Sequence, residues 1–231
     1  MASREIEKKR RKEKHSLQRK RPHLVPSPTI LIVCEGENTE ISYFNQLKLR
    51  SATIQAIGEG YNTVSLVERA ETLAKNTRYD EVWCVFDKDD FAPHDFNNAL
   101  QIAKTKNFHA VYSNQAFEYW ILLHFNDHQG GALHRRRYNE MLNHELQLYG
   151  VSYDGDGCKI ITSDLFNLMF GKESQTGKSR NDLAVERAEK IYERLDHFPP
   201  AKEESSTTVF MLIPQRSESS GSITMFPLPS E

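Results

Sequence analysis

Carboxylates follow two apolar stretches of the chain, at the point where each stretch ends. The first stretch, Ile30–Glu40, reads ILIVCEGENTE and turns acidic at Glu35. The second, Val82–Asp89, reads VWCVFDKD and ends in Asp87 and Asp89. Apolar runs bounded by polar residues predict strands buried on both faces, as in parallel sheets. Open α/β sheets bind ligands at the carboxyl ends of such strands, so we expect the three acids to face one crevice.

Three carboxylates in one crevice predict a metal site, because like charges repel unless a cation lies among them. Oxygen donors favour Mg²⁺ or Mn²⁺ over zinc. Asp87 and Asp89 suit such a site, since alternate residues of an extended segment point the same way. Glu40 is the expected further metal ligand, one helical turn beyond a solvated Glu37. The alternative is that these acids are ordinary caps and turn residues.

Both acidic stretches resemble the signature of the Toprim domain, a metal-binding module of topoisomerases, primases and several nucleases. That signature is a Glu–Gly after one strand and an Asp-x-Asp after a later one. Glu35–Gly36 fits the first half, and Asp87-Lys88-Asp89 fits the second.

A closer resemblance is to the RloB family, small Toprim-like proteins of bacteria and archaea. Its basic arm and EGExTE motif are matched by the N-terminus and by Glu35–Glu40. Its WxVFDxD-like strand is matched over Trp83–Asp89, and its SNxxFExWLLLHF-like segment over Ser113–Phe125. The motifs occur in the family's order, and the resemblance extends from about residue 29 to about residue 195.

The resemblance implies a Mg²⁺- or Mn²⁺-dependent nuclease that cleaves DNA or RNA in defence against phage. It also implies a possible partner, either an AAA-type ATPase or restriction-modification subunits. A lysine is expected about where Lys159 stands, where it could neutralise charge on a metal-bound phosphate or simply be a surface lysine. Two other functions stay open: a non-catalytic binding or regulatory subunit, and a different phosphotransfer reaction on nucleotides.

Glu118 lies within an otherwise apolar helix that the sequence predicts over Ala116–Phe125. A carboxylate in such surroundings is costly unless it is paired or bound to a metal. We therefore expect Glu118 to be a further catalytic acid, and the alternative is a structural ion pair with a nearby Lys or Arg.

Positive charge is concentrated at the N-terminus, although the net charge of the 231-residue chain is only −2. Residues 1–22 contain ten Lys or Arg and three Glu, whereas the rest has 20 basic and 29 acidic residues, a formal charge of −9. Such an arm either contacts phosphates or remains a solvated tail. The residues expected to bind nucleic acid are Lys8, Lys9, Arg10, Arg11, Lys12 and a second cluster, Arg135, Arg136 and Arg137.

Strand and helix patterns alternate from residue 29 onward, which predicts a Toprim-like α/β fold. We expect a central, mostly parallel sheet flanked by helices, with a helical C-terminal part. The predicted organisation is a basic flexible arm over 1–28, a Toprim-like domain over 29–198 and a tail over 199–231. The tail holds one apolar island, Val209–Ile213, which is a candidate edge strand.

Membrane insertion is not expected, because the sequence has no apolar stretch of spanning length and no apolar signal-peptide core. The three cysteines, Cys34, Cys84 and Cys158, are widely spaced and form no zinc motif. Free thiols of this kind suggest a reducing compartment, so a cytoplasmic location is expected.

Overall fold

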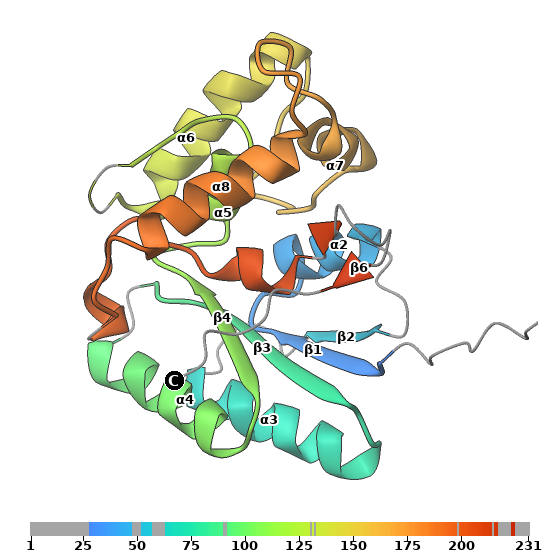
Figure 1. The fold of residues 1–231 in the computed structure, drawn as a ribbon, viewed down its shortest axis with the longest axis vertical. Coiled ribbons are helices and arrows are strands. Elements are labelled where there is room, and N and C mark those ends of the chain that lie inside the picture. The colour runs from blue at the N-terminus through green and yellow to red at the C-terminus, as the bar shows by residue number, and fades with distance from the viewer. Residues whose placement is uncertain are drawn as a thin grey trace, which may run out of the picture.

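Four parallel strands form the central sheet of the computed structural model, in the order β2-β1-β3-β4 (Figure 1). The predicted α/β class is therefore confirmed. The strands are β1 (Ile30–Cys34), β2 (Ala52–Ala56), β3 (Glu81–Asp87) and β4 (His109–Ser113). The structure describes residues 28–47, 52–56, 63–89, 92–129, 131, 133–197, 199–213, 215–216 and 223–224. The predicted phosphate contacts of the arm, Lys8, Lys9, Arg10, Arg11 and Lys12, lie outside these ranges.

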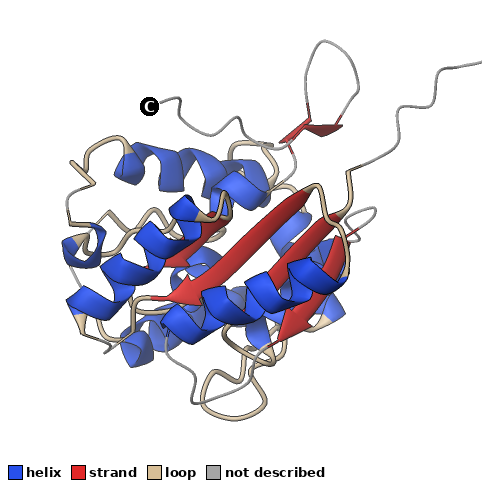
Figure 2. Cartoon of the chain, turned by 90° about the horizontal axis from the view of Figure 1, so that it is seen from below, coloured by secondary structure: helices blue, strands red, loops and turns tan. Residues whose placement is uncertain are grey.

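Side chains of the strands alternate between two apolar cores, one on each face of the sheet. Leu31 and Val33 face helices α3 (Thr63–Asn76) and α4 (Pro93–Thr105), which cover one face (Figures 1 and 2). Ile32 belongs to the larger core on the opposite face. This two-sided burial explains why the strands are continuous apolar runs rather than alternating ones.

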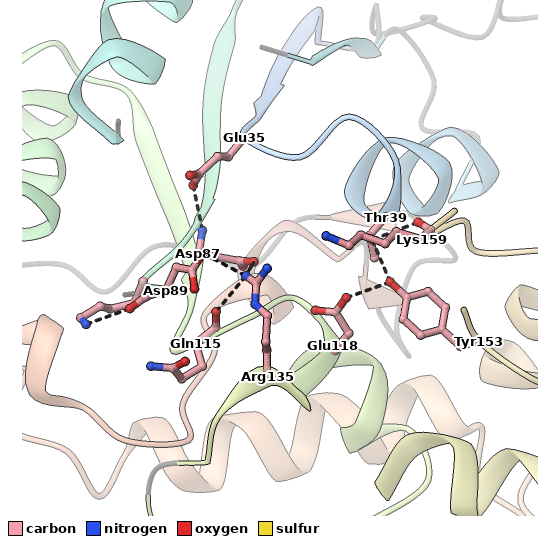
Figure 3. A network of polar contacts seen from close by, with 10 residues as sticks. Glu35, Thr39, Asp87, Asp89, Gln115, Glu118, Arg135, Tyr153 and Lys159 are labelled. Carbon is pink, nitrogen blue, oxygen red and sulfur yellow. Dashed lines mark hydrogen bonds and ion pairs between the residues drawn. The ribbon is translucent and has the colours of Figure 1, made fainter. Parts of the chain in front are cut away.

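The larger core is built around a second layer of helices, on the face of the sheet opposite α3 and α4. These helices are α2 (Thr39–Leu47), α5 (Glu118–Leu123), α6 (Arg135–Leu146), α7 (Ser163–Phe170) and α8 (Arg180–Tyr192). All six residues of α5 are buried, because the helix packs against both α6 and α8. The helix is shorter than predicted, and its first residue, Glu118, lies near the carboxyl ends of the strands (Figure 3).

The predicted edge strand over Val209–Ile213 is wrong, because this segment forms a short 3₁₀ helix, η3 (Val209–Leu212). Its side chains are buried between β4 and α8. The residues just before it do cover the edge of β4: the Thr208 amide donates to the Tyr112 carbonyl at 2.8 Å. A single antiparallel bridge also joins Ser113 to Thr207. The compact part of the chain therefore continues past residue 198.

The remaining short elements lie in the same C-terminal part. They are η1 (Gln147–Tyr149), η2 (Pro200–Lys202) and an antiparallel pair of β5 (Gln215–Arg216) with β6 (Ile223–Thr224). Among the helices of the described ranges, none is both long and apolar enough to cross a membrane.

Candidate functional site

Glu35 and Asp87 meet because their strands are neighbours. The Glu35 amide extends the pairing of β1 with β3 by donating to the Val85 carbonyl at 3.0 Å. The Asp87 amide in turn donates to Oε2 of Glu35 at 3.3 Å. The two acids therefore lie together at the carboxyl edge of the sheet, as the sequence predicts (Figure 3).

Asp89 leaves β3 in an unusual backbone conformation, with φ of +32°. Gln115, next to Asp89, and Lys159, on the other side of the site, also have positive φ, at +71° and +52° (Figure 3). Such values are rare for residues other than glycine and are often found where a functional site fixes the backbone. Three of the six described non-glycine residues with positive φ are thus at this one place.

Glu40 is buried and turns back toward the start of its own helix. Its carboxylate accepts hydrogen bonds from its own amide and from the amide of Gly36. A Cβ atom at Gly36 would collide with this carboxylate. Glu37, in contrast, is exposed, so the structure separates the two glutamates as expected.

Glu118 is held by a tyrosine rather than by a basic side chain. The Tyr153 hydroxyl donates to Oε1 of Glu118 at 2.8 Å, and the same hydroxyl lies 2.8 Å from the Thr39 hydroxyl. Burial, and then the charge of Glu118, raise the pKa of Tyr153, so its hydroxyl keeps its proton. Neither Tyr153 nor Thr39 was among the residues predicted for the site.

Lys159 reaches the site from the loop that follows Tyr153. Its carbonyl accepts a hydrogen bond from the Thr39 hydroxyl at 3.0 Å, which anchors the loop to the first turn of α2. Its side chain points toward the same centre as the acids in Figure 3. The predicted lysine is therefore near the carboxylates.

Arg135, at the start of α6, enters the site between the acids. Its Nη2 atom lies 3.2 Å from Oδ2 of Asp89 and 3.6 Å from Oδ2 of Asp87. The predicted basic cluster is split by this arrangement, because the two arginines that follow Arg135 are exposed. Arg137 pairs with Glu140 on the surface of the same helix, at 2.7 Å.

Five acids share this site with one guanidinium, and we call them the carboxylate cluster. Its members are Glu35, Glu40, Asp87, Asp89 and Glu118. Each of them interacts electrostatically with Arg135. The cluster therefore carries more negative charge than Arg135 can neutralise when its acids are ionised.

The pKa values of the acids in the carboxylate cluster reflect this excess of negative charge. Burial raises the pKa of Glu35 to about 7, and the charges of Glu40 and Asp89 add to the effect. Burial followed by the charge of Glu118 raises the pKa of Glu40 to about 7. The pKa of Asp87 is also well above its usual value, through burial and then the neighbouring acids. A cation among these groups would favour their ionised forms.

A divalent metal is the kind of cation that this donor set suits, since every donor is a carboxylate oxygen. The present positions of the side chains are less favourable for binding a metal. In the described ranges, no three His, Cys, Asp or Glu side chains are grouped closely enough to hold an ion. Arg135 takes a place among the acids instead. The residue types thus fit Mg²⁺ or Mn²⁺, and a bound ion would require the side chains to rearrange.

The all-parallel sheet with flanking helices defines an α/β protein that is consistent with a Toprim-like fold. A family model described as RloB-like protein matches residues 30–215, which is most of the chain. The chain therefore belongs to the RloB-like family, as its motifs indicate. Comparison with curated proteins and with solved structures gave no match.

Proposed function

We propose that the protein is a Mg²⁺- or Mn²⁺-dependent nuclease that hydrolyses phosphodiester bonds of DNA or RNA. The observation that supports this most is the carboxylate cluster: five acids, from the ends of β1 and β3 and the starts of α2 and α5, interact with a single guanidinium at the edge where parallel sheets bind ligands. Surplus buried negative charge of this kind is stabilised by a divalent cation.

In this proposal Glu35, Glu40, Asp87 and Asp89 hold the metal, which would polarise the phosphate and activate a water molecule. Glu118 faces the same centre in an orientation that Tyr153 fixes. Lys159 supplies positive charge to the phosphate. The basic arm and the exposed Arg136 and Arg137 contact the nucleic-acid backbone, where Lys and Arg provide affinity without sequence preference.

A role in defence against phage, with an ATPase or restriction-type partner, is part of the same proposal. Membership of the RloB-like family supports it.

One observation favours a second function, that of a non-catalytic binding or regulatory subunit. Arg135 already pairs with Asp87 and Asp89, so a part of the acidic charge is neutralised within the chain. A permanent pair of this kind would leave the acids with a structural role. The two proposed functions differ in whether the protein binds a divalent ion and cleaves nucleic acid.

Cleavage of labelled DNA and RNA by purified protein in Mn²⁺ or Mg²⁺ tests the proposal. Glu35→Gln should lower the rate by roughly a hundredfold or more, because it removes a metal ligand while keeping the side-chain shape. Glu37→Gln is the matched control, since Glu37 is exposed two residues away, and it should cleave like the wild type. Equal cleavage by all three proteins, or no cleavage by any, would contradict the proposal.

A further inference from the structure

Arg135 is held loosely for a charged group in an acidic site. One nitrogen, Nη2, serves both aspartates and also lies 3.4 Å from the Gln115 carbonyl. All three distances are at or beyond the upper end of the range for good hydrogen bonds. The two-pronged pairing that stabilises most arginine–carboxylate contacts is absent from these described contacts.

Two buried polar atoms beside this contact are left without partners in the part of the chain that the structure describes. They are Nε of Arg135 and Oε1 of Gln115. An unpaired buried donor or acceptor is costly, and such atoms commonly mark a position where an ion, water or ligand is bound. The present placement of Arg135 therefore satisfies the site only in part.

Electrostatic attraction explains why the Arg135 guanidinium nevertheless lies among the acids. Arginine keeps its charge at any physiological pH, and Arg135 is near all five members of the carboxylate cluster. Without an added cation, moving Arg135 away would increase the mutual repulsion of the ionised acids. With a divalent ion among the acids, the same guanidinium would be repelled.

We propose that Arg135 occupies the place of the metal in the metal-free protein, and that a divalent ion displaces its guanidinium toward the phosphate of the substrate. This inference rests on the proposed metal-dependent function. It assigns Arg135 two roles, as a competitor of the metal and as a phosphate-binding residue. It also distinguishes Arg135 from Arg136, which is exposed on the same helix.

Mn²⁺ titration by calorimetry, without nucleic acid, tests the first role. Arg135→Gln should bind Mn²⁺ about tenfold more tightly than the wild type, because the competing cation is gone, which corresponds to about 1.4 kcal/mol. Arg136→Gln removes an equal charge from the surface and should bind Mn²⁺ as the wild type does. Unchanged or weaker binding by Arg135→Gln would overturn the inference.

Cleavage at saturating Mn²⁺ tests the second role, and the expected change is in the opposite direction. Arg135→Gln should cleave at least tenfold more slowly despite its tighter metal binding, because a phosphate-binding cation is lost. Tighter Mn²⁺ binding by a variant that cleaves at the wild-type rate would refute the phosphate role. If no protein cleaves but Arg135→Gln still binds Mn²⁺ more tightly, the nuclease function fails and the displacement stands. If no protein binds Mn²⁺, both fail.

A measurement on the wild type covers the case in which Arg135→Gln does not fold. Phenylglyoxal modifies accessible arginines, and mass spectrometry can quantify the modification at each position. Mn²⁺ should increase modification of Arg135 severalfold and leave Arg136 unchanged. The same or lower modification of Arg135 in Mn²⁺ would show that the metal does not release the guanidinium.

Discussion

Gly36 and Glu40 act as one unit within the acidic motif. The Glu40 carboxylate lies against Gly36, whose amide donates to it and whose missing side chain leaves it space. The spacing of the two residues therefore has a physical reason: the first turn of α2 bends the acid back onto the loop that leaves β1. A side chain at this position would force the Glu40 carboxylate to move.

Gly36→Ala should lower the free energy of unfolding by roughly 1–3 kcal/mol, the usual range for overpacking, because the added methyl group would displace the buried Glu40 carboxylate. In a Glu40→Ala background the same change should have almost no effect, because the colliding carboxylate is gone. Urea unfolding of the four proteins in this double-mutant cycle measures the coupling. An equal loss in both backgrounds would mean that Gly36 is needed for a reason other than Glu40.

The acids themselves could be predicted from the sequence, but their partners could not. Glu35, Asp87 and Asp89 follow apolar runs, and that pattern locates the edge of a parallel sheet. Tyr153 follows no such pattern, because its bond to Glu118 joins residues 35 positions apart. Arg135 was predicted as one of three equivalent phosphate contacts, since adjacent residues look alike in sequence but point in different directions on a helix.

Among the elements, the segment from Glu203 to Ile213 completes the edge of the sheet. The Asn114 amide donates to the Ser206 carbonyl at 2.8 Å, and the Tyr112 amide donates to the Thr208 hydroxyl, also at 2.8 Å. The following apolar side chains of η3 are buried in the larger core. This segment therefore forms hydrogen bonds along the edge of β4, and it also contributes side chains to the larger core.

A chain ending at residue 202 should therefore fail to give a cooperative thermal transition, whereas one ending at residue 216 should melt close to the full-length protein. Each buried apolar side chain of η3 contributes about 1.5–3 kcal/mol, so their combined loss is comparable with the whole stability of a domain. Circular dichroism melts of both truncated chains provide the measurement. A cooperative transition in the shorter chain would show that β4 tolerates an uncovered edge.

Whether a segment forms a helix or a strand could be predicted where its hydrophobic pattern was long, and not where that pattern was short. The apolar stretch that begins at Val82 forms β3, and the helix predicted over Ala116–Phe125 contains α5. The apolar island Val209–Ile213 is too short to show a period, and its burial on several sides suits a 3₁₀ helix as well as a strand. Tertiary packing decided between them.

For the molecule as a whole, the raised pKa values of Glu35 and Glu40 predict how stability depends on pH. An acid with a higher pKa in the folded than in the unfolded state binds its proton more tightly when folded. Ionisation therefore opposes folding between the ordinary value of 4.5 and the folded value of about 7. The contribution of each acid is on the order of 3 kcal/mol at most.

We expect the metal-free protein to lose stability as pH rises from 5 to about 7.5, and Glu35→Gln to lose less over the same interval. Exposed acids with lowered pKa, such as Asp80 and Glu71, change stability mainly below pH 5, outside this interval, so the difference between the two proteins isolates the site. Denaturant titrations in EDTA measure it, and Glu37→Gln should follow the wild type. Parallel pH profiles for wild type and Glu35→Gln would contradict the assigned burial.

The chain of contacts from Thr39 through Tyr153 to Glu118 also affects the order in which the candidate site can assemble. These bonds join residues 114 and 35 positions apart, so they close long loops late in folding. A partly folded chain can contain the strands that carry Glu35 and Asp87 and still lack an oriented Glu118. If the protein is the proposed nuclease, it would therefore become active only when most of the domain has assembled, and a partly folded chain would not cut nucleic acid.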